Sequence, residues 1–321
     1  MDDAQIGSID VAQGKALTAV RFKPSKSLRS DIESSKAFDT DALSQAFEKL
    51  SEEKLLLKEA LYVMDAQNRH SRKRIKMIVP VPVPESALLE FSAQILAELI
   101  RSDIEVDFVG TRNGAYILDS FYEATLADAF CLDMGSRAET EGYAAVCVNS
   151  MSDSGVSALG ARLSIPVVGP GQASFLLAAA LGKRFSVITM WQRWDWIYEK
   201  LARETGLQHA LASIRNIDTR PDAQELLSGK EDFVFEKLEH ACRIAIDQDG
   251  ADTLILGSTT MHQSLSYLKD RLEVPILNPG LVAFKLCETL LDLGLMHSRK
   301  AYPAPQRFDD DLFRLVPPRF P

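Results

Sequence analysis

The sequence predicts an α/β protein with two similar lobes, each a mainly parallel β-sheet flanked by helices. Three observations support this fold class. A stretch at 144–171 occurs again at 251–280, each copy opens with an apolar run too short for a helix, and each continues through a helix-like segment to a second apolar run. Such runs are typical of strands buried on both faces of a parallel sheet. Strand–helix–strand order is also the connection that parallel strands require.

The two copies share short motifs at a constant offset. These motifs are Arg162-Leu163, Pro166 and Pro170-Gly171 in the first copy, and Arg271-Leu272, Pro275 and Pro279-Gly280 in the second. A shift of one residue then aligns Ser150 with Ser258. Ligands of parallel sheets bind beyond the carboxyl ends of the strands, where the next helix offers free N–H groups to an anion. We therefore expect Ser150 and Ser258 to face one ligand from two matched half-sites.

The composition is that of a globular protein large enough for two lobes. The chain has 321 residues, 46% of them hydrophobic and 25% charged, and a net charge of −9. The negative charge argues against nucleic acid as a partner, and the basic run 72–76 is interpreted as the solvated entrance of a strand. No apolar run is long enough for a membrane span, and the acidic N-terminus does not resemble a signal peptide. We expect a cytoplasmic protein that binds neither nucleic acid nor a membrane.

The cysteines and the glycine-rich turn exclude several kinds of site. Cys131, Cys147, Cys242 and Cys287 are widely spaced, which favours buried thiols in a reducing compartment over disulfides or zinc ligands. The turn at 169–174 follows the fourth strand of a lobe and lacks the third Gly of a dinucleotide fingerprint. The sequence therefore predicts no NAD, no other cofactor and no metal site.

Composition and pattern divide the chain into four parts. We expect an N-terminal arm at 1–74, a first lobe at 75–180 completed by 285–302, a second lobe at 181–284 and a tail at 303–321. The arm contains an amphipathic helix at 41–68, whose core is too small to stand alone. We expect the arm to pack on the body or on a partner subunit, and the protein to be a homo-oligomer.

Periodicity predicts the remaining elements. In the first lobe they are a strand at 75–79 that ends in alternating prolines, a helix at 86–101, a strand at 106–109 and a helix at 120–130 before the first repeat. A helix at 173–181 leads to the second lobe, whose elements are strands at 185–189 and 212–217 and helices at 197–205 and 233–247 before the second repeat. A last helix at 282–293 is expected to cross back to the first lobe.

The repeat and several flanking motifs resemble the aspartate/glutamate racemase superfamily, and within it the hydantoin racemase-like branch. The matching segments are 143–155, 165–174, 184–189, 250–261 and 298–303. The resemblance covers roughly 75–305, and the arm lies outside it. It implies two pseudo-symmetric lobes with an active site in the cleft and cofactor-free chemistry. In the family, one cysteine from each lobe acts on opposite faces of a carbon acid.

Both cysteine positions carry serine in this chain. Alignment on Tyr143, Asp153 and Gly155 puts Ser150 at the first position, and alignment on Gly257 and Met261 puts Ser258 at the second. A thiol ionises near neutral pH, whereas a serine hydroxyl is a far weaker acid and needs a neighbouring base. Two-thiol racemisation is therefore not expected, and Cys147 is predicted to be a core residue of a strand.

Three explanations of the serines remain open. The chain belongs to a branch with changed chemistry on a small carboxylate or cyclic amide, such as decarboxylation, elimination, hydration or ring hydrolysis. Alternatively, it is a Cys→Ser variant of a two-thiol racemase, made to be inactive, or a binding protein that uses the same cleft. We favour the first explanation because the neighbouring Ser152, Ser154, Thr259 and Thr260 also depart from the family pattern.

The ends of the other strands supply further candidate residues. The expected ligand contacts are Val81, Asn149, Met151, Ser152, Thr189, Trp191, Thr259, Thr260 and Asn278. His262 and Asp153 are candidate bases. The structural alternative for His262 is a position at the surface. The structural alternative for Asp153 is stabilisation of the N-terminus of the helix that follows it. Trp191, Trp194 and Trp196 form either an apolar wall over the ligand or part of the packing.

Overall fold

The computed structural model describes residues 72–220, 231–311 and 317–319, with the side chains of 231–233 excepted. The chain divides into two compact units, Met1–Arg72 and Lys73–Pro321. Residues 1–71 of the predicted arm, with its helix at 41–68, lie outside the described residues, as does part of the predicted tail. Lys73 and Arg74, predicted as the end of the arm, belong instead to the first strand of the sheet. Among the helices that are described, none is both long and apolar enough to cross a membrane.

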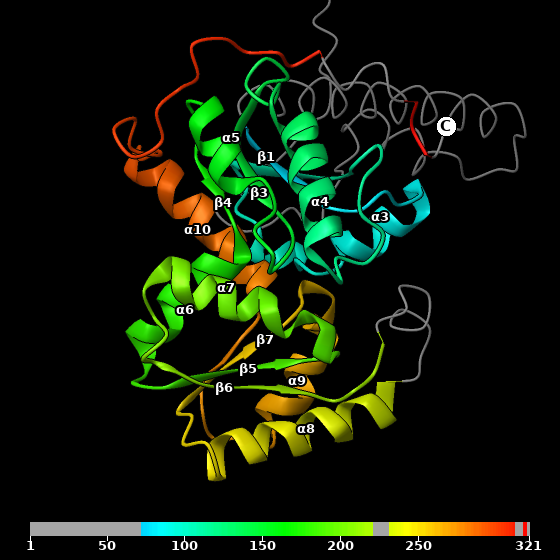
Figure 1. Ribbon diagram of the computed structural model, residues 1–321, viewed down its shortest axis with the longest axis vertical. Helices are drawn as coiled ribbons and strands as arrows, with labels where there is room; N and C mark the ends of the chain where they lie inside the picture. The colour runs from blue at the N-terminus through cyan, green and yellow to red at the C-terminus, as the bar shows by residue number, and fades with distance from the viewer. Residues whose placement is uncertain (1–71, 221–230, 312–316, 320–321) are drawn as a thin grey trace, which may run out of the picture. The chain divides into compact units, whose positions relative to one another are not determined.

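The first lobe is a four-stranded parallel sheet with the strand order β2-β1-β3-β4 (Figure 1). Its strands are β1 (Lys73–Val79), β2 (Ile104–Gly110), β3 (Tyr143–Val148) and β4 (Val167–Val168). Its helices are α3 (Glu85–Ser92), α4 (Phe121–Gly135) and α5 (Val156–Arg162).

The second lobe repeats this arrangement, with the strand order β6-β5-β7-β8. Its strands are β5 (Phe185–Thr189), β6 (Leu211–Asn216), β7 (Thr253–Leu256) and β8 (Ile276–Leu277), and its helices are α7 (Asp195–Thr205), α8 (Glu231–Asp247) and α9 (Ser264–Lys269). Each strand of the first sheet thus has a counterpart at the same position in the second. The predicted α/β class with two similar parallel sheets is confirmed.

Burial explains why the central strands are continuously apolar. Every residue from Ile75 to Val79 is buried, including Lys76, because helices cover both faces of the sheet. The Lys76 ammonium donates hydrogen bonds to the Met134 carbonyl and to a Glu141 carboxylate oxygen. The expectation that the whole basic run is solvated is therefore wrong at Lys76, since these two acceptors replace water around its charge.

The helices after the last strand of each lobe, α6 (Pro170–Leu181) and α10 (Pro279–Leu293), pack against each other. Phe284 and Cys287 of α10 lie in the core of the first lobe with Ile75, so the last helix crosses back as expected. Phe175 of α6 lies in the core of the second lobe with Phe185. Each sheet is thus completed by a helix that directly follows the last strand of the other.

The predicted helix at 86–101 is interrupted. The helix α3 ends at Ser92, and a short 3-10 helix spans Ala97–Leu99 after an extended backbone at Leu96. The interruption buries Gln94 and Ile95, which a continuous surface helix would not do. Tertiary packing has therefore overridden the helical periodicity of this segment.

Phe284→Ala tests the role of α10 in the first lobe. We expect the free energy of unfolding to fall by about 3–5 kcal/mol because a fully buried aromatic ring is lost. Denaturant unfolding measures the change. Leu293→Ala, at a position 63% exposed on the same helix, is the control and should change it by less than about 0.5 kcal/mol. Equal effects of the two variants would contradict the packing of α10 on this sheet.

Candidate active site

The sheet topology brings Ser150 and Ser258 to equivalent points. In the order β2-β1-β3-β4 the direction of the connections reverses between β1 and β3, and in the second sheet it reverses between β5 and β7. Such switch points form the ligand crevices of open α/β sheets. Ser150 follows β3 and Ser258 follows β7, so each serine lies at the switch point of its own lobe.

The same backbone hydrogen bond holds both loops. The Asn149 N–H donates to the Ile78 carbonyl over 2.7 Å, and the Gly257 N–H donates to the Ile188 carbonyl over 2.7 Å. Each bond ties the residue before the serine to the central strand of its sheet. The position of both serines is therefore set by the sheets.

The two loops meet across the lobes. The Thr259 hydroxyl donates to the Asn149 carbonyl over 3.4 Å, which joins the residue after Ser258 to the residue before Ser150. Asn149 and Thr259 are buried, whereas Ser150 and Ser258 are half-buried and retain solvent access. The pair of serines predicted from the repeat thus flanks one direct contact between the lobes.

Each serine makes the same local hydrogen bonds. The Ser152 N–H donates to Ser150 Oγ and the Thr260 N–H donates to Ser258 Oγ, both over 3.3 Å. Ser150 Oγ is 2.9 Å from Ser152 Oγ, and Ser258 Oγ is 2.8 Å from Thr260 Oγ1. Backbone donors and neighbouring hydroxyls therefore orient both side chains.

Asn149 and Asn278 lie beside the first turn of α10. Asn278 Oδ1 accepts hydrogen bonds from the N–H groups of Gly280 and Leu281, which makes it the N-cap of that helix. Asn149 Nδ2 donates to Gln94 Oε1 over 3.0 Å, while Asn149 Oδ1 is buried without a partner among the described residues. An acceptor in that state is suited to a ligand N–H group.

Gln94 was not predicted as a site residue. It lies in the segment whose periodicity indicated a continuous helix, so its sequence context did not point inward. A polar residue among apolar neighbours, Phe91 and Ile95, was the one signal available.

Asp153 stabilises a different helix from the one expected. Its carboxylate accepts the N–H groups of Gly171 and Gln172, in the first turn of α6, over 2.8 and 2.7 Å. The expectation that it acts on its own helix, α5, is therefore wrong. Asp153 has a left-handed backbone with φ of 51°, which turns its side chain toward α6. Burial raises the pKa of Asp153 to about 7, against the lowering by its two N–H donors.

His262 lies in the 3-10 helix Thr259–Gln263 that follows Ser258. Burial lowers its pKa, so the imidazole is neutral at neutral pH. Its Nδ1 atom is buried without a partner among the described residues. His262 keeps the protonation state that a base requires, and its assignment as a base stays a prediction.

Several predicted ligand contacts point into the protein. Thr189 is fully buried, and its hydroxyl is 2.8 Å from the Tyr198 hydroxyl, which donates to the Gly257 carbonyl over 2.6 Å. Met151 is buried in the core of the second lobe with Leu201, and Val81 packs on a small cluster in the first lobe. Thr189 therefore supports the second loop, while Met151 and Val81 take part in apolar packing.

The tryptophans form contacts between the lobes. Trp194 Nε1 donates to the Ile117 carbonyl over 3.0 Å, and the Trp196 ring lies 4.7 Å from the Phe121 ring. Trp191 and Trp194 also pack on the core of the second lobe. Of the two roles expected for the tryptophans, a wall over the ligand or a part in the packing, Trp194 and Trp196 have the second.

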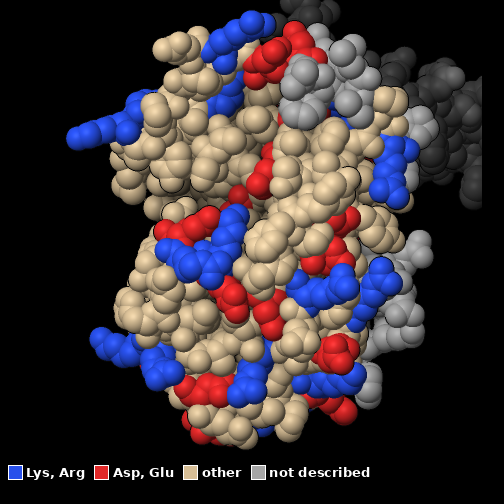
Figure 2. All heavy atoms as spheres, in the orientation of Figure 1, with Lys and Arg blue, Asp and Glu red and all other residues tan. Residues whose placement is uncertain are grey.

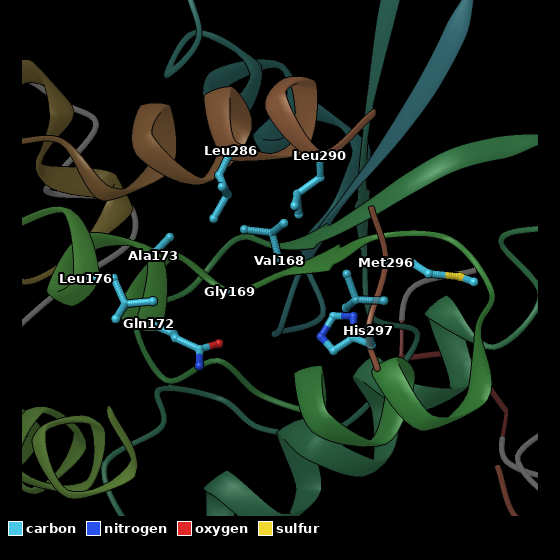
Figure 3. A pocket seen from close by; sticks show the side chains of 10 residues that line it. Val168, Gly169, Gln172, Ala173, Leu176, Leu286, Leu290, Met296 and His297 are labelled. Atoms are coloured by element: carbon cyan, nitrogen blue, oxygen red, sulfur yellow. The ribbon is translucent and has the colours of Figure 1, made fainter. Parts of the chain in front are cut away.

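A cavity of about 220 Å³ lies at a different place (Figure 3). It is bounded by β4, the first half of α6, the second half of α10 and the segment that follows α10, and it includes Gln172, Leu290 and His297 among its lining residues. None of the predicted site residues lines it. We assign the candidate site to the serine loops, because the switch points and the matched residues of the repeat converge there, whereas the cavity lies beside β4, away from both switch points.

Metal binding has no support among the described residues 72–220, 231–311 and 317–319. In these ranges no group of three or more His, Cys, Asp or Glu side chains is arranged to hold an ion. The four cysteines are buried as free thiols.

The geometry defines a two-lobed α/β protein whose matched loops meet at the ends of two parallel sheets. Residues 86–287 match the model of the Asp/Glu/Hydantoin racemase family. The chain therefore belongs to this family. The family match spans both serine loops and most of each sheet.

Two sequence relatives and one solved structure show the extent of the similarity. The hydantoin racemase of Pseudomonas sp. (strain NS671) is 28% identical over 208 residues, which are 64% of this chain and 82% of the relative. The hydantoin racemase of Paenarthrobacter aurescens is 25% identical over 231 residues, or 70% and 94% of the two chains. The allantoin racemase from Klebsiella pneumoniae superposes with a TM-score of 0.67 at 24% identity, covering 74% of this chain and 95% of that one, which shows the shared fold.

Asp153→Asn tests the raised pKa of this carboxyl by the pH dependence of stability. Because the native pKa is raised, the folded state holds a proton that the unfolded state has lost between about pH 4 and 7. The free energy of unfolding therefore falls as the pH rises through this window. Burial raises the pKa of Asp195 to about 6, so this residue also makes the free energy of unfolding fall as the pH rises.

We expect the free energy of unfolding of Asp153→Asn to fall less than that of the wild type over this pH range. Denaturant unfolding from pH 4 to 8 measures both. Asp270→Asn, an exposed change, serves as the control and should follow the wild-type curve. An unchanged slope in Asp153→Asn would rule out a proton on this side chain near pH 6.

Proposed function

We propose that the protein is an enzyme that needs no cofactor and acts on a small carboxylate or cyclic amide bound between the two serine loops. Ser150 and Ser258 stand at the acid/base cysteine positions of the family, and the reaction is of the isomerase or lyase type. The contact of Thr259 with the Asn149 carbonyl carries the proposal, because it brings the two half-sites together.

The substrate class follows from the groups around the serines. Asn149 Oδ1, which has no partner among the described residues, can accept an N–H group, and the Ser258 hydroxyl can donate to a carbonyl or carboxylate oxygen. A cyclic amide carries both an N–H group and a carbonyl. The relatives named as hydantoin and allantoin racemases favour the same class.

The change from sulfur to oxygen restricts the mechanism. A serine hydroxyl is too weak an acid to ionise alone near neutral pH, so it orients or polarises the substrate unless a base draws its proton away. Racemisation by two equivalent thiols is therefore not part of the proposal. Decarboxylation, elimination or one-sided proton exchange remains compatible with two hydroxyls.

Turnover in deuterated water is the direct test. The protein is incubated with hydantoins, aryl malonates, maleate and amino acids, and NMR follows deuterium exchange and product formation. We expect activity on at least one of the first three substrates. Measurable binding without any exchange or product would instead support a binding protein.

Substitution of the two serines tests their roles. Ser150→Ala and Ser258→Ala should each lower turnover by about 100-fold or more, the usual contribution of positioned acid–base groups. Ser157→Ala, an exposed hydroxyl on α5, is the matched control and should leave turnover unchanged. Full activity in both alanine variants would disprove the assignment.

Ser150→Cys combined with Ser258→Cys addresses the inactivated-variant alternative. If the chain is a two-thiol racemase with both sulfurs replaced, the double variant should racemise a hydantoin, which polarimetry detects. Ser157→Cys controls for an added thiol. No racemisation by the double variant would favour a natural change of chemistry.

A further inference from the structure

A row of hydroxyl groups leads from Ser150 to a carboxylate. Ser150 Oγ is 2.9 Å from Ser152 Oγ, which is 2.8 Å from Ser154 Oγ. Asp128 of α4 lies next to Ser154: its Oδ1 atom accepts the N–H group of the adjoining Gly155 over 2.9 Å, and the Ser154 hydroxyl lowers the pKa of its carboxyl. Ser152 and Ser154 are buried, at 5% and 1% exposure, while Asp128 lies on the exposed side of α4. The row thus connects the candidate site with a titratable group at the surface.

Hydrogen-bond chemistry sets the direction of the row. An ionised carboxylate can only accept, so Ser154 donates to Asp128. The single proton of Ser154 is then used, and Ser154 must accept from Ser152, which in turn accepts from Ser150. Ser150 also accepts the Ser152 N–H. One lone pair of Ser150 Oγ remains, and it is available to a proton of a bound substrate.

The loop is shaped to reach α4. Gly155 has a left-handed backbone with φ of 71°, and a Cβ atom there would lie 2.9 Å from the Asp128 carbonyl oxygen. Only a residue without a side chain allows this close approach. The Gly155 N–H donates to Asp128 Oδ1 over 2.9 Å, which fixes the carboxylate next to Ser154.

The surroundings of Asp128 suit a proton acceptor. Loss of water around the carboxyl raises its pKa, while the Gly155 N–H, Lys200 and the Ser154 hydroxyl lower it. Lys200 belongs to α7, over which acidic and basic side chains lie next to one another (Figure 2). Cys131, on the same helix as Asp128, is a buried thiol whose pKa is raised. A carboxylate with a raised pKa is a stronger base than an ordinary one.

The second loop lacks this extension. Ser258 Oγ is paired with Thr260 Oγ1 over 2.8 Å, and no hydrogen bond of the described residues leads from Thr260 to a carboxylate. The two half-sites match at the serine but differ in what lies behind it. Only the first has a path for a proton to leave.

We infer that Ser150, Ser152, Ser154 and Asp128 form a proton relay in which Asp128 takes up the proton that Ser150 removes from a substrate carbon. This inference rests on the proposed function and names its base. The C–H bond breaks and its electron pair stays on the substrate, which becomes a carbanion stabilised by its carbonyl. The three hydroxyl protons each move by one oxygen, and Asp128 changes from carboxylate to acid. No oxidant or second reactant is required.

The relay makes the chemistry one-sided. Ser150 acts as the base through Asp128, while Ser258 donates a hydrogen bond to the substrate. Proton removal is then restricted to one face of the carbon, which distinguishes this chain from an enzyme with two equivalent acid–base groups.

Asp128→Asn and Ser154→Ala interrupt the relay at two places. Both should lower the rate of deuterium exchange by about 100-fold or more with little change in KM, because binding groups are untouched. Asp128→Glu should restore part of the activity and shift the acidic limb of the pH–rate profile, which a purely structural role would not do. Ser157→Ala and Asp270→Asn are the controls, and circular dichroism checks folding.

A second readout does not depend on turnover. An arylsulfonyl fluoride labels a serine when its oxygen attacks sulfur, fluoride leaves and the hydroxyl proton is accepted by a base. Mass spectrometry should find Ser150 labelled in the wild type, and at least about 10-fold more slowly in Asp128→Asn and Ser154→Ala, because a single positioned base contributes that much or more. Labelling with this dependence but no turnover on any substrate would retain the relay and reject the proposed function.

Unchanged labelling and unchanged exchange in a folded Asp128→Asn or Ser154→Ala variant would overturn the relay. Equal labelling of Ser150 and Ser258 in the wild type would also contradict it, because the second serine has no such path. Ser154→Ala removes one buried hydroxyl and keeps the carboxylate, so it remains informative if Asp128→Asn fails to fold.

Discussion

The backbone hydrogen bonds that anchor the two serine loops are the constraint on which the site depends. Asn149 N–H bonds to Ile78 of β1, and Gly257 N–H bonds to Ile188 of β5, at the same point of each sheet. The carboxyl ends of parallel strands lie at the same end of the sheet. Each loop is therefore held at that end, at the point where the direction of the connections reverses. The Thr259–Asn149 contact then joins these ends of the two sheets. Hydrogen bonds to the central strands and one contact between the loops therefore fix where the serines lie.

In the proposed function, two hydroxyls stand where the family has two thiols, and this change alone would weaken the acid–base chemistry of the site. A thiol provides its own ionisable group, whereas a hydroxyl depends on its surroundings. In this chain the first serine is followed by Ser152 and Ser154, which connect it to Asp128. The second is followed by Thr260 alone. In the proposed relay, two halves of similar fold therefore carry different proton chemistry.

The remaining polar groups near the loops act mainly as supports. Asp153 holds the first loop against α6, and Asn278 caps the first turn of α10. Thr189 and Tyr198 hold the second loop through the Gly257 carbonyl. Polar residues at strand ends were reasonable candidates for ligand contacts, but hydrogen bonds within the protein already occupy several of them. A sequence indicates that a residue is near a strand end; it does not indicate which way the side chain turns.

The sequence by itself determined the architecture and the equivalence of Ser150 and Ser258, because apolar runs and Pro-Gly motifs repeat along the chain and their physical meaning is local. The return of α10 to the first lobe and the resemblance to the family followed from the same patterns. Only the tertiary structure decided that Asp153 serves α6, that Gln94 turns inward and that Asp128 lies behind Ser154. Each of these depends on contacts between segments far apart in sequence. Such contacts arise from the packing of whole elements, which no short pattern encodes.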